Sequence, residues 1–132
     1  MTINNKLLDE LTTQAKANPR LRQNFDLRNT PNDQSQRMLN AMEPGTQLPI
    51  HRHTTSSETV IVLRGAIRQN EYNNRGELIN QFIAQPGGDN FGFCVEAGVW
   101  HRAESLLTGT IIIECKDGAW QPLSNEDILD IQ

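Results

Sequence analysis

The sequence lacks the features that mark several large classes of protein. None of its 132 residues lie in an apolar run approaching the roughly 20 residues that a membrane-spanning helix requires. It has no cluster of lysine and arginine, and its net charge of −4 disfavours a phosphate-backbone partner. The first 20 residues lack the apolar segment of a secretory signal. We therefore expect no nucleic acid and no membrane among its partners, and a cytoplasmic location.

Cysteine is also scarce. Cys94 and Cys115 are the two cysteines, and each lies in a β-like apolar segment far from the other. The absence of a close C-x-x-C pair excludes a zinc ribbon or a thioredoxin-type redox motif. We predict buried thiols in a reducing compartment, where free cysteine behaves as a small apolar residue.

The N-terminal part has a helical pattern. Leu7, Leu8, Leu11 and Ala15 recur at helical spacing, and Pro19 follows them. The polar, turn-rich segment 20–36 has no clear period. We expect a short N-terminal helix followed by a covering loop or extended arm.

From residue 37 onward, short apolar runs alternate with Gly, Pro, Asn and Asp, which is typical of an all-β sandwich or barrel. The predicted strands cover residues 37–42, 58–65, 66–72, 77–85, 91–96, 101–107 and 109–116. Ser124 followed by Asp127 predicts a short C-terminal helix. We expect one domain over residues 1–132, made of a helix and arm (1–36), a barrel (37–117) and a tail (118–132).

Histidine is rare, yet two of the three histidines stand side by side in the chain. His51 and His53 point to the same face of a strand, whereas Arg52 points away. Such a pair can simply face solvent. A metal site becomes possible if Glu58, at the start of the next strand, and His101, in a later strand, converge on the same interior. Three imidazoles and one carboxylate suit a divalent transition metal such as Zn, Fe, Mn or Ni. A closed structural zinc site more often uses cysteine thiolates, so this donor set favours an open metal site.

The spacing of these residues resembles the first motif of the cupin superfamily. Gly45 is followed after five residues by His51-x-His53, after four more by Glu58, and after six more by Gly65. Every position of that motif is matched. Glycines at the two ends fit turns that other residues avoid.

A second cupin motif is partly present around His101. Gly98 precedes His101 by the expected two intervening residues. Asn90, Glu96 and Ser105 stand where the motif usually has glycine, proline and asparagine. These departures alter the turn but leave the histidine in place.

Longer segments, residues 36–67 and 98–123, resemble the WbuC-type cupin-fold metalloproteins, small bacterial proteins often encoded among surface-polysaccharide genes. The resemblance implies an all-β cupin fold, a double-stranded β-helix or jelly-roll barrel. It also implies one divalent metal ion bound through His51, His53, Glu58 and His101.

Two classes of function follow from this resemblance. The first is a metal-dependent enzyme acting on a small polar molecule, such as a sugar or sugar nucleotide in polysaccharide metabolism. The second is a non-catalytic metallo-cupin that binds or senses a small ligand. Arg37 is either a contact for an anionic substrate or a surface charge, and Glu96 is either an acid or base near the site or a rim residue. The arm and the exposed strand edges favour a homodimer.

Overall fold

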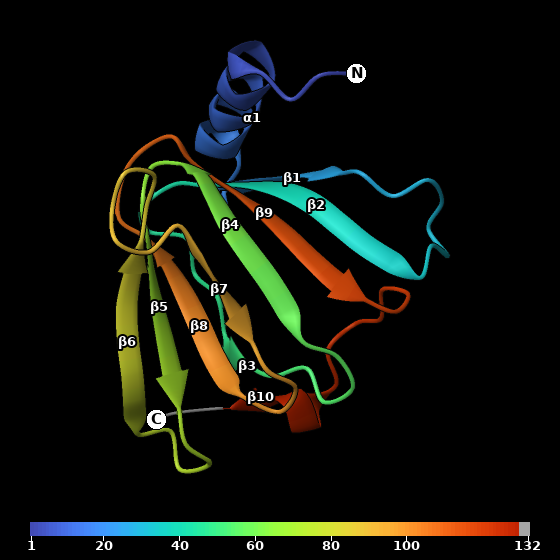
Figure 1. Ribbon diagram of the computed structural model, residues 1–132, viewed down its shortest axis with the longest axis vertical. Helices are drawn as coiled ribbons and strands as arrows, with labels where there is room; N and C mark the ends of the chain where they lie inside the picture. The colour runs from blue at the N-terminus through green and yellow to red at the C-terminus, as the bar shows by residue number, and fades with distance from the viewer. Residues whose placement is uncertain (130–132) are drawn as a thin grey trace.

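The computed structural model describes residues 1–129, which form one helix and two antiparallel sheets of five strands each (Figure 1). The helix, α1, spans Asn5–Ala17. The first sheet has the order β1 (Arg22–Asp26), β2 (Ser35–Met42), β9 (Thr110–Asp117), β4 (Glu58–Arg64) and β7 (Gly92–Val95). The second has the order β10 (Ile128–Leu129), β3 (Ile50–His51), β8 (Trp100–Ser105), β5 (Ile67–Tyr72) and β6 (Leu78–Ala84). Within the described residues, no helix is long and apolar enough to cross a membrane.

The β prediction is confirmed, because each strand predicted from the sequence overlaps an observed strand. Alternation along each strand sends one set of side chains between the sheets. On β4, Val60 and Val62 are buried, whereas Ile61 between them is exposed. The buried side chains between the sheets form one apolar cluster, made of Met42, Val60, Val62, Ile67, Ala84 and Ile112.

The predicted N-terminal helix is present and covers the outer face of the first sheet (Figure 1). The Asn4 side chain caps its first turn by accepting a hydrogen bond from the Leu7 backbone N–H at 3.1 Å. Leu8, Leu11 and Ala15 are buried, and they pack with Leu39 and other outward-facing side chains of β2 and β9. This second apolar cluster therefore lies outside the barrel, on the side away from the interior.

The segment expected to be a covering loop or arm is partly a strand. Residues 22–26 form β1, which pairs antiparallel with β2 at the edge of the first sheet. Backbone hydrogen bonds to β2 and contacts with α1 hold β1 in place. The strand therefore needs no apolar face of its own, and its polar sequence shows no hydrophobic period. The arm was one reason to expect a homodimer, and the exposed strand edges were the other. The homodimer stays a prediction, which light scattering would test.

Two further expectations are corrected. The C-terminal helix is absent from the described residues: Asn125–Asp127 form a single 3-10 turn, followed by β10 beside β3. The Ser124 hydroxyl donates to the Asp127 carboxylate instead of capping a helix. Cys94 and Cys115 are exposed rather than buried, because alternation places both on the outer face of the first sheet, on either side of Thr59.

Candidate metal centre

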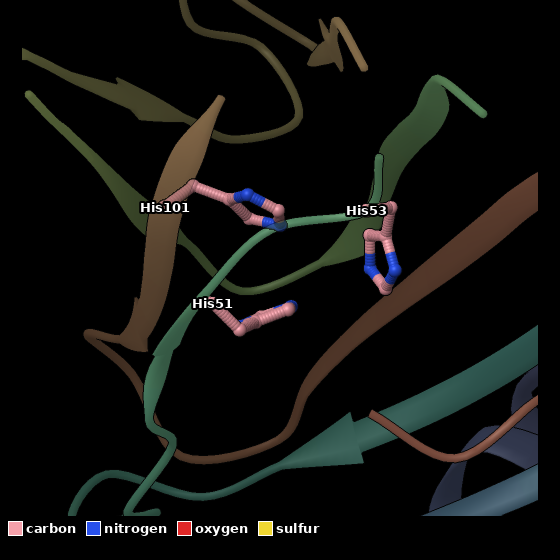
Figure 2. Close-up of side chains that lie close together, drawn as sticks. All are labelled: His51, His53 and His101. Atoms are coloured by element: carbon pink, nitrogen blue, oxygen red, sulfur yellow. The ribbon is translucent and has the colours of Figure 1, made fainter. Parts of the chain in front are cut away.

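The three histidines converge between the sheets (Figure 2). His51 lies on β3, His53 on the loop that follows it, and His101 opposite His51 on the neighbouring strand β8. The ring centroids of His51 and His101 are 4.3 Å apart, and those of His53 and His101 are 5.8 Å apart. One ring nitrogen from each histidine lies within 4.8 Å of those of the other two. This group could hold a metal ion, as the sequence predicted.

One backbone contact links the two motifs of the sequence. The Gly98 N–H donates a hydrogen bond to the His53 carbonyl oxygen at 2.7 Å, which fixes the turn before His101 against the loop that carries His53. Gly98 has a φ of +88°, a left-handed conformation that favours glycine. Gly98 therefore permits the turn that leads into His101.

Arg52 and Trp100, the chain neighbours of the histidines, point to the opposite face of the second sheet. The Arg52 guanidinium lies 4.4 Å from the centre of the Trp100 ring, and its Nε donates to Asp127 at 3.1 Å. Trp100 is buried with Ile50 and Tyr72. Strand alternation predicted this separation for Arg52, and the contacts hold β3, β8 and the 3-10 turn together behind the site.

Hydrogen bonds fix which nitrogen of His51 and His101 carries the proton. A carbonyl oxygen can only accept, so His51 Nδ1–H donates to Pro49 at 3.0 Å and His101 Nδ1–H donates to Val99 at 2.9 Å. Their Nε2 atoms are left with free lone pairs. The Nε2 of His101 is buried and has no hydrogen-bond partner among the described residues. A buried acceptor without a partner is costly in a protein interior, and a metal ion would satisfy it.

Glu58 lies beside this group. Its Oε2 is 3.3 Å from His53 Nε2, and the exposed fractions of the two side chains are 13% and 19%. Glu58 begins β4 on the facing sheet, and its inward position follows from alternation with buried Val60 and Val62. The group of donor atoms that lie within 4.8 Å of one another contains the three histidines and not this carboxylate, so Glu58 as the anionic fourth ligand stays a prediction.

Burial keeps His51 and His101 neutral, the state in which histidine binds metals. It lowers the pKa of His51 from 6.5 to about 4, with the nearby His101 adding to the effect. It also lowers the pKa of His101, although the carbonyl of Val99 opposes the shift. Burial works against ionisation of Glu58, but the hydrogen bond from His53, with the neighbouring His101, outweighs it and lowers the pKa of Glu58. His51 and His101 are therefore neutral, and Glu58 ionised, near neutral pH.

The interior carries further ionisable side chains that the sequence reasoning missed. Glu71 on β5 is the register partner of His101 and accepts a hydrogen bond from Asn80. Glu114 and Lys116 on β9 share the inward face of that strand with buried Ile112. The signal was available, because alternation in "IIIECK" from one buried isoleucine puts the glutamate and the lysine on the same face.

Glu114 and Lys116 differ in their relation to the histidines. Burial, with the nearby charge of Glu58, raises the pKa of Glu114 from 4.5 to about 8, so this carboxyl holds a proton near neutral pH. Lys116 is the register partner of Glu58, and its Nζ lies 3.4 Å from His53 Nδ1. The wall opposite His51 and His101 therefore offers a proton donor and a cation.

A cavity of about 450 Å³ borders this group on the side of His53 and Lys116. Its wall is mostly polar and includes Gln34, Gln36, Thr54 and Ser56. A volume of this size is in the range of small-molecule sites. His53 is thus not sealed beneath apolar side chains.

Two candidate residues from the sequence lie away from the histidines. Arg37 is on the outer face of β2 with Leu39, and its guanidinium pairs with Asp33 at 3.2 Å. Glu96 is exposed in the turn after β7, where its carbonyl accepts from the Val99 N–H. The structure brings neither side chain to the centre, and Glu71 and Glu114 are the carboxyl groups that face the interior in addition to Glu58.

Comparison with solved structures identifies the fold. The chain matches KdgF from Halomonas sp. with a TM-score of 0.59 and 18% identity, covering 76% of this chain and 82% of KdgF. It matches the capsular polysaccharide assembling protein CapF from Staphylococcus aureus with a TM-score of 0.60 and 22% identity, covering 75% and 29%. It matches the cupin domain of Cnp3 from Schizosaccharomyces pombe with a TM-score of 0.57 and 12% identity, covering 75% and 65%. This is a cupin fold with three inward histidines, and the chain spans most of KdgF but less than a third of CapF.

The sequence comparison gives the family. Residues 3–84 match the family described as a domain of unknown function, DUF6016. The chain belongs to this family, whose model spans α1 and the segments that carry His51, His53 and Glu58. No curated protein matches the sequence.

Proposed function

We propose that this protein is a metal-dependent cupin enzyme that acts on a small polar molecule, such as a sugar or sugar nucleotide in polysaccharide metabolism. One divalent transition metal ion is held by His51, His53, Glu58 and His101. The observation that carries the proposal is the convergence of the three histidines, with the buried Nε2 of His101 lacking a partner among the described residues. The name of CapF and the resemblance to WbuC-type proteins support the polysaccharide context.

The donor set fits an open metal site better than a structural one. Four protein donors leave coordination positions for water or ligand on a six-coordinate ion, and the neighbouring cavity gives a small molecule access. When bound, such an ion polarises a carbonyl or hydroxyl oxygen.

The chain supplies its own groups for moving protons. Glu114 carries a proton near neutral pH and faces the interior from β9, so it can donate to a leaving or developing oxygen. Glu71 faces the interior from the other sheet, beside His101. A protonated carboxyl group on one wall and a second carboxyl group on the facing wall suit acid–base chemistry better than passive ligand storage. They favour the enzyme over the non-catalytic binding module.

Elemental analysis of the protein purified without added metal tests the first part of the proposal. We expect close to one equivalent of a single transition metal per chain, and its loss in His101→Ala. A screen of sugars, sugar phosphates and sugar nucleotides with that metal then tests for turnover. Glu114→Gln should retain the metal and lose turnover. Wild-type protein that binds no transition metal, even after reconstitution, would overturn the proposal.

A further inference from the structure

Lys116 restricts His53 in a way that has no counterpart at the other two histidines. An ammonium group can only donate hydrogen bonds. Across the 3.4 Å contact with Lys116 Nζ, His53 Nδ1 must therefore be the acceptor. The ring proton is then on Nε2, which lies 3.3 Å from the Glu58 carboxylate. His53 thus holds the opposite tautomer from His51 and His101, both of which carry the proton on Nδ1.

A metal ion bound to His53 is incompatible with this contact, whichever nitrogen it uses. If Nε2 is the ligand atom, the neutral ring carries its proton on Nδ1, and that N–H faces the Lys116 ammonium donor to donor. If Nδ1 is the ligand atom, its lone pair is no longer available to Lys116. In both cases Lys116 loses its acceptor on His53. Glu58, its cross-strand neighbour, is one of the proposed ligands, so its carboxylate charge is shared with the metal.

The space beside Lys116 is the polar cavity of about 450 Å³ that it lines together with His53. Arg52 also borders the cavity, but its guanidinium pairs with Asp127 at 3.1 Å. Asp117 also borders the cavity, although it alternates with Lys116 along β9 and is exposed. Among residues 1–129, Lys116 forms no ion pair, although its charge helps to lower the pKa of the neighbouring Glu58. The side-chain amides and hydroxyls around Lys116 can add hydrogen bonds to a ligand.

We propose that this cavity binds the oxyanion of a small ligand, a phosphate or a carboxylate, and that Lys116 is the cation that contacts it once a metal has released Lys116 from His53. The inference rests on the proposed function, because it requires a metal bound through His53. It narrows the substrate class to a molecule that carries an oxyanion beside the polar group at the metal. It also makes metal and oxyanion binding mutually favourable, since coupling between two sites is reciprocal.

The tautomer of His53 reports directly whether metal binding releases Lys116 from His53. Long-range nitrogen–proton NMR spectra of the protein, which has only three histidines, distinguish a protonated Nδ1 from a protonated Nε2. In the metal-free protein we expect His53 protonated on Nε2 and the other two on Nδ1. In zinc-loaded protein the His53 proton should have moved to Nδ1, or a zinc-induced shift should appear at Nδ1. A metal-free His53 protonated on Nδ1 would overturn the inference.

Calorimetry tests the role of Lys116. Lys116→Met and Lys116→Gln should bind zinc more tightly than wild type, by about threefold to tenfold, because a competing hydrogen bond and a like charge are removed. Lys6→Met is the matched control, because it removes the same charge at an exposed position on α1, and it should bind zinc as wild type does.

Titrations with inorganic phosphate and with acetate complete the test and distinguish the two kinds of oxyanion. Zinc-loaded wild type and Lys6→Met should bind at least one of them, metal-free protein about tenfold more weakly, and the Lys116 variants about tenfold more weakly even when loaded. Oxyanion binding that is equal in metal-free and loaded protein, or unchanged in the Lys116 variants, would overturn this inference. If wild type binds zinc and the Lys116 variants bind zinc and oxyanions as wild type does, the proposed function stands and this inference alone is overturned. Wild type that binds no zinc overturns both.

Discussion

The two halves of the barrel interior are built from the same strands but differ in chemistry. At one end, β4 and β9 contribute Val60, Val62 and Ile112 to a buried apolar cluster. At the other end, the same two strands contribute Glu58 and Lys116 on the same inward face. On β4, Val60 in the apolar cluster lies only two residues from Glu58 beside the histidines. The comparison indicates that stability is concentrated in the apolar end and ligand chemistry in the histidine end.

Removing volume from the apolar end should have the largest effect on folding. Ile112 is 2% exposed, and Ile112→Ala should lower the free energy of unfolding by about 2–5 kcal/mol. Urea denaturation of the metal-free protein measures this loss. Zinc affinity of the variant, determined where it is still folded, should stay close to wild type. A large loss of affinity in the folded variant would show that the two ends are not separable.

His101→Ala should weaken zinc binding and leave folding intact, which is the opposite of the result expected for Ile112→Ala. Zinc affinity should fall by about 100-fold or more, because a direct ligand is lost. Removing a residue that only hydrogen-bonds to a metal ligand typically costs less. The metal-free protein should keep its stability or gain some, because the change removes a buried nitrogen that has no partner among the described residues. Competition titration with a zinc chelator and urea denaturation measure the two quantities. Unfolding of the metal-free variant would contradict the comparison.

Glu58→Ala should reduce metal occupancy while leaving the fold intact. It removes the anionic member of the proposed ligand set from a side chain that keeps 13% of its surface exposed. We expect affinity to fall by about 10-fold to 100-fold, a smaller effect than loss of a histidine. Circular dichroism and elemental analysis check the two statements. Loss of soluble protein on this change would instead assign the metal a structural role.

The smallest effect concerns the pH dependence of stability without metal. The pKa of Glu114 is raised to about 8 in the fold, so its contribution to stability is lost as pH rises from 4.5 towards 8. Glu114→Gln mimics the protonated form and should flatten this decline, whereas Glu96→Gln at an exposed position should not. Thermal midpoints measured between these pH values test it, and identical slopes in wild type and Glu114→Gln would contradict it.

His51 imposes the opposite limit at low pH. Its pKa falls from 6.5 to about 4 on folding, so between these values the unfolded chain binds more protons than the native protein. Stability of the metal-free protein should therefore also decline as pH falls from 6.5 towards 4. His51→Asn should reduce that decline, as the same thermal measurements would show.

Most of the fold and the histidine group could be predicted because their signals are local. The short strands have apolar runs bounded by turn residues, and the fixed spacing of His51, His53 and Glu58 is readable within one segment. Strand β1 was missed because its polar side chains carry no period, and pairing with β2 defines it. The sequence does not reveal that β1 pairs with β2, because that pairing depends on the order of the strands in the sheet.

The errors at the cysteines and the omissions at the site have a common physical cause. Residue type suggested that Cys115 is buried, but its position on β9, one residue from inward-facing Glu114 and Lys116, decides the matter. Extending the alternation from Ile112 would have corrected the cysteine and found both ionisable side chains at once. The contact between Lys116 and His53, by contrast, joins residues 63 positions apart and needs the structure.

The central claim is that His51, His53, Glu58 and His101 hold one metal ion at the histidine end of the barrel. A crystal structure of zinc-loaded protein, with anomalous data at the zinc edge, tests it most directly. The account predicts one strong anomalous peak about 2.0–2.1 Å from a nitrogen of each histidine, with a Glu58 oxygen at a similar distance. A peak at the exposed cysteines, or no peak in contact with His51 and His101 together, would contradict it.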